Sequence, residues 1–310
     1  MRSECLDRQS LLTVAAVAGH VVENRLPNRH AVLQNAPMIR YDVRIELAEI
    51  DRAAAREMIL AHHRTLPYSG DFFMPTMQLE SRQLEIMVDG ESAGLTAADG
   101  DSVSLCMINT AVASYDRQIL EAVLAETAAT QAYAASWDLN HADLFGNFAR
   151  GLDNQAYQFE LLRAEDLRDP VPGLSVEPAT EADLAYLDQT DFQPDFREPV
   201  AAGNVRVARL GGQEIGIAML VPHPLNAARV DIGMFTDPDA RRRGIGRSIL
   251  ALSADEVLAT GRVPVAGCWW RNWASRRVLE AAGLTCIGTI FRYSLDPQRF
   301  RGDDTAAPAS

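Results

Sequence analysis

A glycine-rich turn between an expected strand and an expected helix is the strongest constraint in this sequence. Residues 241–246 read Arg-Arg-Arg-Gly-Ile-Gly, after alternating apolar residues at 229–236 and before a helical pattern at about 247–260. The first amides of a helix have no intrahelical partner and lie at the positive end of its dipole, so they attract a phosphate or pyrophosphate. Gly244 and Gly246 have no Cβ, which lets such an anion approach the backbone.

A Gly-x-Gly turn by itself also fits an ordinary tight connection that binds nothing. The order of the segments that follow favours the anion site. An apolar strand ends at Trp269-Trp270, Asn272-x-x-Ser275 then opens a second helix, and Gly283 ends it.

This order over residues 174–295 resembles the GNAT superfamily of N-acetyltransferases. The resemblance implies an α/β fold with a mixed, mostly antiparallel sheet flanked by helices, and acetyl-CoA as co-substrate without a metal. It places the pyrophosphate on the turn and the pantetheine arm along the preceding strand, whose residues would also form sheet core. The implied cofactor-binding residues are Met234, Phe235, Thr236, Arg241, Arg242, Arg243, Gly244, Ile245, Gly246, Arg247, Asn272 and Ser275. For Asn272 a helix N-cap is an alternative role, and one that it can combine with cofactor binding.

Acetyl transfer also needs a base, because an amine is mostly protonated at neutral pH and cannot attack. Asp231, on the strand before the turn, is the candidate base; a surface carboxylate or an ion-pair partner is the alternative. Many family members protonate the leaving thiolate with a Tyr, but this chain has Leu279 at that position. Ser275, Tyr293 on the last strand, or water are the substitutes.

Two aromatic segments are candidates for the acceptor site. Residues 188–196 combine three aspartates with two phenylalanines, which suits an amine with an apolar body, although a solvated loop explains them equally well. Trp269, Trp270 and Trp273 form either core or a wall of the acceptor cleft, where an aromatic face attracts a cation.

The first half repeats this plan. It has an expected hairpin at 84–98, a strand at 102–109, a helix around 119–124 and a strand at 133–137. Asn140 and Asn272, like Phe159 and Phe291, lie about 130 positions apart, a spacing that indicates a duplicated unit. Chance matching of two α/β halves is the alternative. Residues 110–116 replace the glycine turn without glycine or arginine, so we expect a tandem GNAT-like protein whose first domain is degenerate.

The polar stretch 165–173, with two prolines and a glycine, marks a linker between the two domains. The expected organisation is an N-terminal extension at 1–37, a degenerate GNAT-like domain at 38–164, the linker, a catalytic GNAT domain at 174–296 and a disordered tail at 297–310.

Composition narrows the partners. A net charge of −13 and a pI of about 4.9 argue against binding nucleic acid through its phosphates. No apolar run is long enough to span a membrane. The four cysteines lack metal-ligand spacing, which suits reduced thiols in the cytoplasm, and His62-His63 suggests a solvated helix end. We expect a cytoplasmic monomer or homodimer.

Together these features predict an N-acetyltransferase that moves an acetyl group from acetyl-CoA to a primary amine of a small molecule. The alternatives are acetylation of a protein or peptide N-terminus, favoured by Asn272-x-x-Ser275, and a non-catalytic acyl-CoA-binding scaffold protein, favoured by the missing Tyr and the degenerate first half.

Overall fold

The second half of the chain folds largely as its hydrophobic pattern predicts. The computed structural model describes residues 43–190, 192 and 195–296. The predicted extension at 1–37, the tail at 297–310 and three residues of the predicted acceptor loop lie outside the described residues. From Val43 onward the chain forms one compact unit.

The first half (residues 43–160) begins and ends with strands. In chain order it contains β1 (Ile45–Glu49), α1 (Arg52–Thr65), α2 (Phe73–Glu80), β2 (Arg82–Val88), β3 (Glu91–Asp99), β4 (Ser102–Ile108), α3 (Asp116–Thr127), β5 (Gln131–Ala135), α4 (Leu139–Phe148) and β6 (Ala149–Glu160). The predicted hairpin and the strand after it are present, whereas the expected strand at 133–137 lies slightly earlier in the chain, as β5.

The second half (residues 174–296) contains the glycine turn between β10 and α7. Its elements are β7 (Leu174–Pro178), α5 (Leu184–Leu187), α6 (Arg197–Ala201), β8 (Val205–Leu210), β9 (Gln213–Pro222), β10 (Arg229–Thr236), α7 (Ile245–Ala259), β11 (Val263–Trp269), α8 (Trp273–Ala282) and β12 (Thr285–Leu295). Strand β10 has the predicted bounds, and α7 starts just before its predicted first residue. Within the described ranges, none of the helices combines the length and apolar character needed to cross a bilayer.

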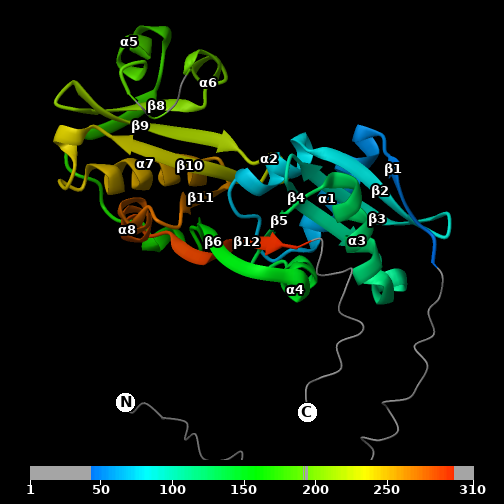
Figure 1. The fold of residues 1–310 in the computed structure, drawn as a ribbon. Coiled ribbons are helices and arrows are strands. Elements are labelled where there is room, and N and C mark those ends of the chain that lie inside the picture. The colour runs from blue at the N-terminus through cyan, green and yellow to red at the C-terminus, as the bar shows by residue number, and fades with distance from the viewer. Residues whose placement is uncertain (1–42, 191, 193–194, 297–310) are drawn as a thin grey trace, which may run out of the picture. The chain divides into compact units, whose positions relative to one another are not determined.

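All these strands join one sheet, and the two halves exchange their last strands (Figure 1). The order is β1-β2-β3-β4-β5-β12-β6-β11-β10-β9-β8-β7. Strand β6 of the first half pairs with β11, and β12 of the second half pairs with β5. The exchanged strands also pair with each other in the middle of the sheet. The predicted division at 165–173 stays a prediction, but a cut there would separate β11 from the strand beside it.

Each half has one parallel strand pair that opens after a few residues. Strands β10 and β11 are paired only from Arg229↔Val263 to Asp231↔Val265, and β4 and β5 only at Ser102↔Gln131 and Val103↔Ala132. Beyond these pairs the backbone N–H and C=O groups of the two strands no longer hydrogen-bond to each other. Each opening can therefore accept a ligand or a side chain as the new partner.

Apolar burial fixes the opening of the second half in place. Helix α7 packs along β9, β10 and β11 (Figure 1). Ile249 on α7 and Phe159 on the exchanged strand β6 are both fully buried in the same core cluster. The position of β6 therefore depends on the second half's core, although it belongs to the first half in sequence.

Candidate active site

The two glycines of the turn have different structural roles. Gly244 is the N-cap of α7 in the left-handed region, with φ of 80°. A Cβ at Gly246 would lie 3.0 Å from Thr236 Oγ1 and 3.3 Å from Met234 Sδ, so glycine lets α7 pack against β10. Ser248 Oγ donates to Gly244 O and accepts from Val171 N–H, which ties the turn to the linker. The turn is thus held from both sides, with the first amides of α7 at its end.

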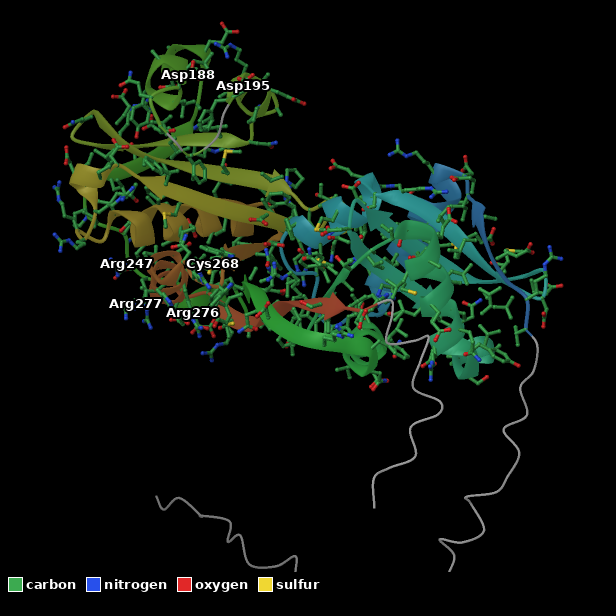
Figure 2. The ribbon with its side chains drawn as sticks, in the orientation of Figure 1. Asp188, Asp195, Arg247, Cys268, Arg276 and Arg277 are labelled. Carbon is green, nitrogen blue, oxygen red and sulfur yellow. The ribbon has the colours of Figure 1, made fainter. Side chains whose placement is uncertain are left out.

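Arginines surround the turn. Arg241 Nε donates to Thr236 O at 3.0 Å, and its guanidinium lies 5.7 Å from the centre of the Phe235 ring. Arg247 on α7 donates to Asp169 O, and Figure 2 shows it on the same flank of the fold as Arg276 and Arg277 of α8. The side chains of Arg242 and Arg243 are exposed. Ile245 is buried, so only its backbone can contact a ligand.

A cleft of about 310 Å³ opens where β10 and β11 separate. Both halves of the chain contribute to its walls, since Asp71 and Phe72 come from the segment between α1 and α2. The second half contributes Phe192, Asp231, Ile232, Gly233, Met234, Leu250, Gly267, Cys268, Trp269, Asn272, Ser275 and Leu279.

Asp231 is a buried carboxylate in the wall of this cleft. The Asp231 side chain accepts a hydrogen bond from Phe72 N–H at 3.0 Å, and Asp231 is 7% exposed. Burial raises the pKa of Asp231 well above its usual range, and the charge of Asp71 raises it further, although the Phe72 hydrogen bond opposes both. No described cationic side chain pairs with it, so the surface or ion-pair alternative does not apply within the described part of the chain.

Asp71 was not singled out by the sequence, and the structure places it against β11. Gln158 Nε2 donates to Asp71 Oδ2 at 3.0 Å, and Gln158 Oε1 accepts from Asp71 N–H at 2.7 Å. A Cβ at Gly267 would overlap Asp71 Oδ2 and Cγ, so glycine is required for this approach. Burial raises the pKa of Asp71, in spite of hydrogen bonds from Gln158 and Phe73. The one sequence signal was Gly267 itself, because glycine inside a strand marks a close approach.

Helix α8 presents the predicted Asn272 and Ser275 to the cleft. Asn272 Oδ1 accepts from Ser275 N–H at 3.0 Å, so Asn272 is the N-cap, and its amide nitrogen is left for other partners. Leu279 lines the cleft where the family has its Tyr and is 3% exposed.

Tyr293 does not reach this cleft, and its prediction as a candidate acid is wrong. Strand exchange carries it to the first half, opposite Ala132 of β5. It is 3% exposed there, in a core cluster with Phe145, whose ring centre is 5.9 Å away. Of the named acids, Ser275 and water are left.

Of the described residues in the predicted acceptor loop, one contributes a side chain to the cleft. Phe192 lines it, whereas Phe196 is fully buried in core. Asp188 and Asp195 both lie within ion-pair distance of Arg197, and Figure 2 shows them beside α5 and α6, away from Cys268 on β11. Their charge is therefore partly balanced outside the cleft.

Comparison with known proteins gives one family match, which covers the second half and the strand before it. Residues 153–285 match the family model described as an acetyltransferase (GNAT) domain. This segment is therefore similar to GNAT acetyltransferase domains. The match begins inside β6 and ends at the start of β12, so it includes the strand that the second half receives from the first.

Solved structures show that the fold of both halves is that of tandem GNAT proteins. A GNAT-family acetyltransferase from Colwellia psychrerythraea is similar over 82% of this chain and 100% of its own, with a TM-score of 0.73 and 11% identity. A tandem GNAT protein from the clavulanic acid biosynthesis pathway is similar over 80% of this chain and 98% of its own, with a TM-score of 0.52 and 11% identity. No curated protein sequence matches this chain significantly. The predicted fold class is confirmed.

In the first GNAT-like half, a histidine fills the opening between the parallel strands. Cys106 on β4 donates its N–H to His141 Nε2 at 3.0 Å. Cys106 is the counterpart of Met234 in the second half. It pairs with Thr96, two residues after Gly94, whose missing Cβ lets the neighbouring strand come close. Met234 pairs in the same way with Ala218, two residues after Gly216. The backbone group that corresponds to Met234 N–H is therefore already bonded within the first half.

The surroundings of this histidine are also unlike a cofactor site. Residues Thr110–Tyr115 form a short 3₁₀ helix in place of the glycine turn. Asp116 and Asp143 line a neighbouring cleft of about 230 Å³, and their charge would repel a pyrophosphate.

His62, Asp138 and His141 form a buried polar cluster at this place. His62 Nε2 and His141 Nδ1 each lie 2.7 Å from Asp138 Oδ2. The three groups are close enough together to hold a metal ion. However, His141 Nε2 accepts from Cys106, so the proton of the neutral ring is on Nδ1, the atom that would have to bind the metal. The geometry fits a hydrogen-bonded cluster better than a metal site.

Two sequence expectations are wrong here. His62 and His63 are not a solvated helix end, because both are half-buried and His63 Nε2 bonds to Gln78 Oε1. The counterpart of Asn272 is Asp138 and not Asn140, since Asp138 is the N-cap of α4 as Asn272 is of α8. A slip of two positions in the repeat caused this error.

Replacing Asp138 with asparagine should lower the free energy of unfolding by about 3 kcal/mol at pH 7. Burial raises the pKa of Asp138, but hydrogen bonds from His141 and His62 outweigh it, so the net pKa is strongly lowered. The ionised form therefore stabilises the fold above its unfolded pKa of about 4, and this stabilisation is lost as the pH falls below that value.

Urea unfolding between pH 3 and pH 7 measures this effect, with Asp153→Asn as the control for an exposed carboxylate paired to Arg292. Equal, small losses in the two variants would contradict the role assigned to the cluster.

Proposed function

We propose that this protein transfers an acetyl group from acetyl-CoA to a primary amine of a small molecule. The observation that carries the proposal is the cleft in which the buried Asp231 carboxylate shares a wall with the β10 backbone and with Asn272 and Ser275. A base, a backbone edge for the thioester and protic groups for the leaving sulfur thus meet in one place.

The residues around the turn fit the phosphates of acetyl-CoA. The first amides of α7 and the guanidinium groups of Arg241–Arg243 and Arg247 would hold the pyrophosphate, because both supply positive charge. Gly244 allows the close approach, since its backbone already adopts φ of 80°. Met234 lies between the turn and the cleft, so the pantetheine arm would follow β10 toward Asp231.

Asp231 would act as the general base. Its raised pKa brings the carboxyl closer to neutral pH, which makes proton transfer from an ammonium group less unfavourable. Met234 N–H would donate to the thioester oxygen, because its counterpart in the first half points into the same kind of opening. Ser275 would supply a proton to the thiolate, which is a tolerable leaving group with a thiol pKa near 8.5.

The cleft favours a small acceptor. Its volume of about 310 Å³ must also hold the thioester end of acetyl-CoA. Phe72, Phe192 and Trp269 stand at its walls with 42%, 37% and 54% of their surfaces exposed, so they offer apolar faces to a ligand.

Release of the CoA thiol from acetyl-CoA tests the proposal, with a panel of monoamines, polyamines, amino acids and short peptides, and with mass spectrometry of the product. We expect at least one small amine to accelerate release about tenfold or more over hydrolysis. Acceleration by peptides alone would favour the N-terminal alternative. Saturable acetyl-CoA binding with no turnover of any acceptor would contradict catalysis and leave the scaffold alternative.

A further inference from the structure

We infer that Asp71, supplied by the first half, is a second functional carboxylate of the acceptor site and binds the acceptor's ammonium group together with Asp231. The inference rests on the proposed acetyl transfer and narrows its substrate class. It also gives the degenerate half a direct part in the reaction.

The segment that carries Asp71 is built into the opening of the second half. Gln158, on the exchanged strand β6, bonds both the backbone and the side chain of Asp71. The next residue, Phe72, donates its N–H to Asp231. Gly70 adopts φ of 69°, and a Cβ there would lie 2.9 Å from Gln158 Oε1. The sharp bend at Gly70 and the missing Cβ of Gly267 together bring the two carboxylates to one cleft.

The pair lacks a cation within the described part of the chain. Neither Asp71 nor Asp231 has an ion-pair partner there, and their charges act on each other. Two buried like charges are costly to ionise, so a cationic ligand between them would relieve the repulsion. The apolar faces of Phe72 and Phe192 beside them suit the uncharged body of such a ligand.

Among the described residues, the charge of Asp71 also acts on Cys268 of β11, on which Arg276 of α8 acts in the opposite direction. Burial, partly opposed by Arg276, raises the pKa of Cys268 to about 11, so the thiol is neutral when the pair titrates. The strand β6 presents the uncharged Gln158. The protonation of the pair is thus set by burial, by the hydrogen bonds from Phe72, Phe73 and Gln158, and by the two carboxylates themselves.

The proton balance of the reaction uses both carboxylates. The ionised pair binds R–NH₃⁺ and takes one of its protons, which the two carboxylates then share. The neutral amine forms a bond to the thioester carbonyl carbon, and the carbon–sulfur bond breaks with its electron pair on sulfur. Ser275 passes its hydroxyl proton to the sulfur and receives the second amine proton in its place, so amide and CoA thiol leave. The pair then loses its proton to solvent.

This arrangement selects against an acceptor with a carboxylate beside its amine. An α-amino acid would bring its own negative charge next to Asp71, whereas the matching decarboxylated amine would not. We therefore expect a phenylalkylamine to have a kcat/KM at least about tenfold above that of the matching α-amino acid.

The test compares Asp71→Asn with the wild-type chain on this substrate pair. In the variant, KM for the amine should rise about tenfold, discrimination against the amino acid should fall, and the Kd of acetyl-CoA should not change. Removing the like charge lowers the pKa of Asp231, so the acid limb of the pH profile of kcat/KM should move to lower pH.

Gly267→Ala should change KM and the pH profile in the same direction, because the added Cβ displaces Asp71. Asp99→Asn and Gly151→Ala are the controls, because Asp99 is exposed and a Cβ at Gly151 meets nothing closer than 3.7 Å.

Amine binding to the CoA-loaded protein, measured by calorimetry, separates the two proposals. Turnover by the wild type with an unchanged KM and pH profile in Asp71→Asn would overturn the role of Asp71 and leave acetyl transfer standing. If the wild type binds the amine without turnover and Asp71→Asn binds it more weakly, the ammonium site is supported and acetyl transfer is contradicted. Equal binding in the two proteins, or no binding in either, would overturn the inference.

Discussion

Replacing Asp231 with asparagine should lower kcat for amine acetylation by about 10²- to 10⁴-fold, the usual contribution of a general base. Asparagine has nearly the same shape and can still accept the hydrogen bond from Phe72 N–H, so the cleft should keep its form. The Kd of acetyl-CoA should be unchanged, because the carboxylate lies at the acceptor end of the cleft. Steady-state kinetics with a saturating amine and calorimetry with acetyl-CoA measure the two quantities.

The free energy of unfolding distinguishes this loss of kcat from misfolding of the Asp231→Asn variant. The pKa of Asp231 is raised in the folded state, so ionising it costs stability, and that cost grows as the pH rises from about 4 through the folded pKa. The asparagine variant should escape the cost and unfold at equal or higher urea concentration at pH 7. A variant that is inactive and also less stable would not support the base role, and unchanged turnover would contradict it.

Local chemistry explains which parts of this fold the sequence predicts. The bounds of β10 follow from alternation along one strand, and the cap at Asn272 from a hydrogen bond to Ser275, three residues away. A capping box of Thr180 and Asp183 likewise joins two residues that are three positions apart. Each depends on neighbours in the chain, so each is visible without knowledge of tertiary contacts.

Strand exchange is not visible in this way. Strands β6 and β12 are both long and antiparallel, and each could pair with either β5 or β11 as far as local pattern goes. Which pairing forms depends on the burial of the whole sheet. The error over Tyr293 follows directly, because its strand completes the first half.

Asp71 was missed for a related reason. It lies in a short segment with Pro, Ser and Gly between two helices of the degenerate half, where a solvated turn is the ordinary expectation. Its place in the cleft depends on Gln158 and Gly267, which are far away in sequence. A search for functional residues limited to the family-matched range, 153–285, would exclude it.

Replacing Gly244 with glutamate should weaken acetyl-CoA binding by about 100-fold or more, or about 2.8 kcal/mol. The substitution adds a Cβ to a residue with φ of 80° and places a negative charge at the end of α7, where the pyrophosphate would bind. Gly212→Glu is the matched control: Gly212 has φ of 85°, and a Cβ there meets nothing within 4 Å. Both variants carry similar backbone strain and the same charge, but only one changes the turn.

Calorimetric titration of acetyl-CoA into the two variants and the wild-type chain should also give one site per chain. The first half lacks the turn, bonds the Cys106 amide to His141 and lines its neighbouring cleft with Asp116 and Asp143. The missing turn and the bonded amide each remove a contact that we propose for the second half, and the two aspartates would repel a pyrophosphate. Two sites in the wild type, one of them surviving Gly244→Glu, would show that the first half binds the cofactor by other means. If Gly244→Glu binds acetyl-CoA at a single site with wild-type affinity, the proposal that the pyrophosphate binds at the turn is contradicted.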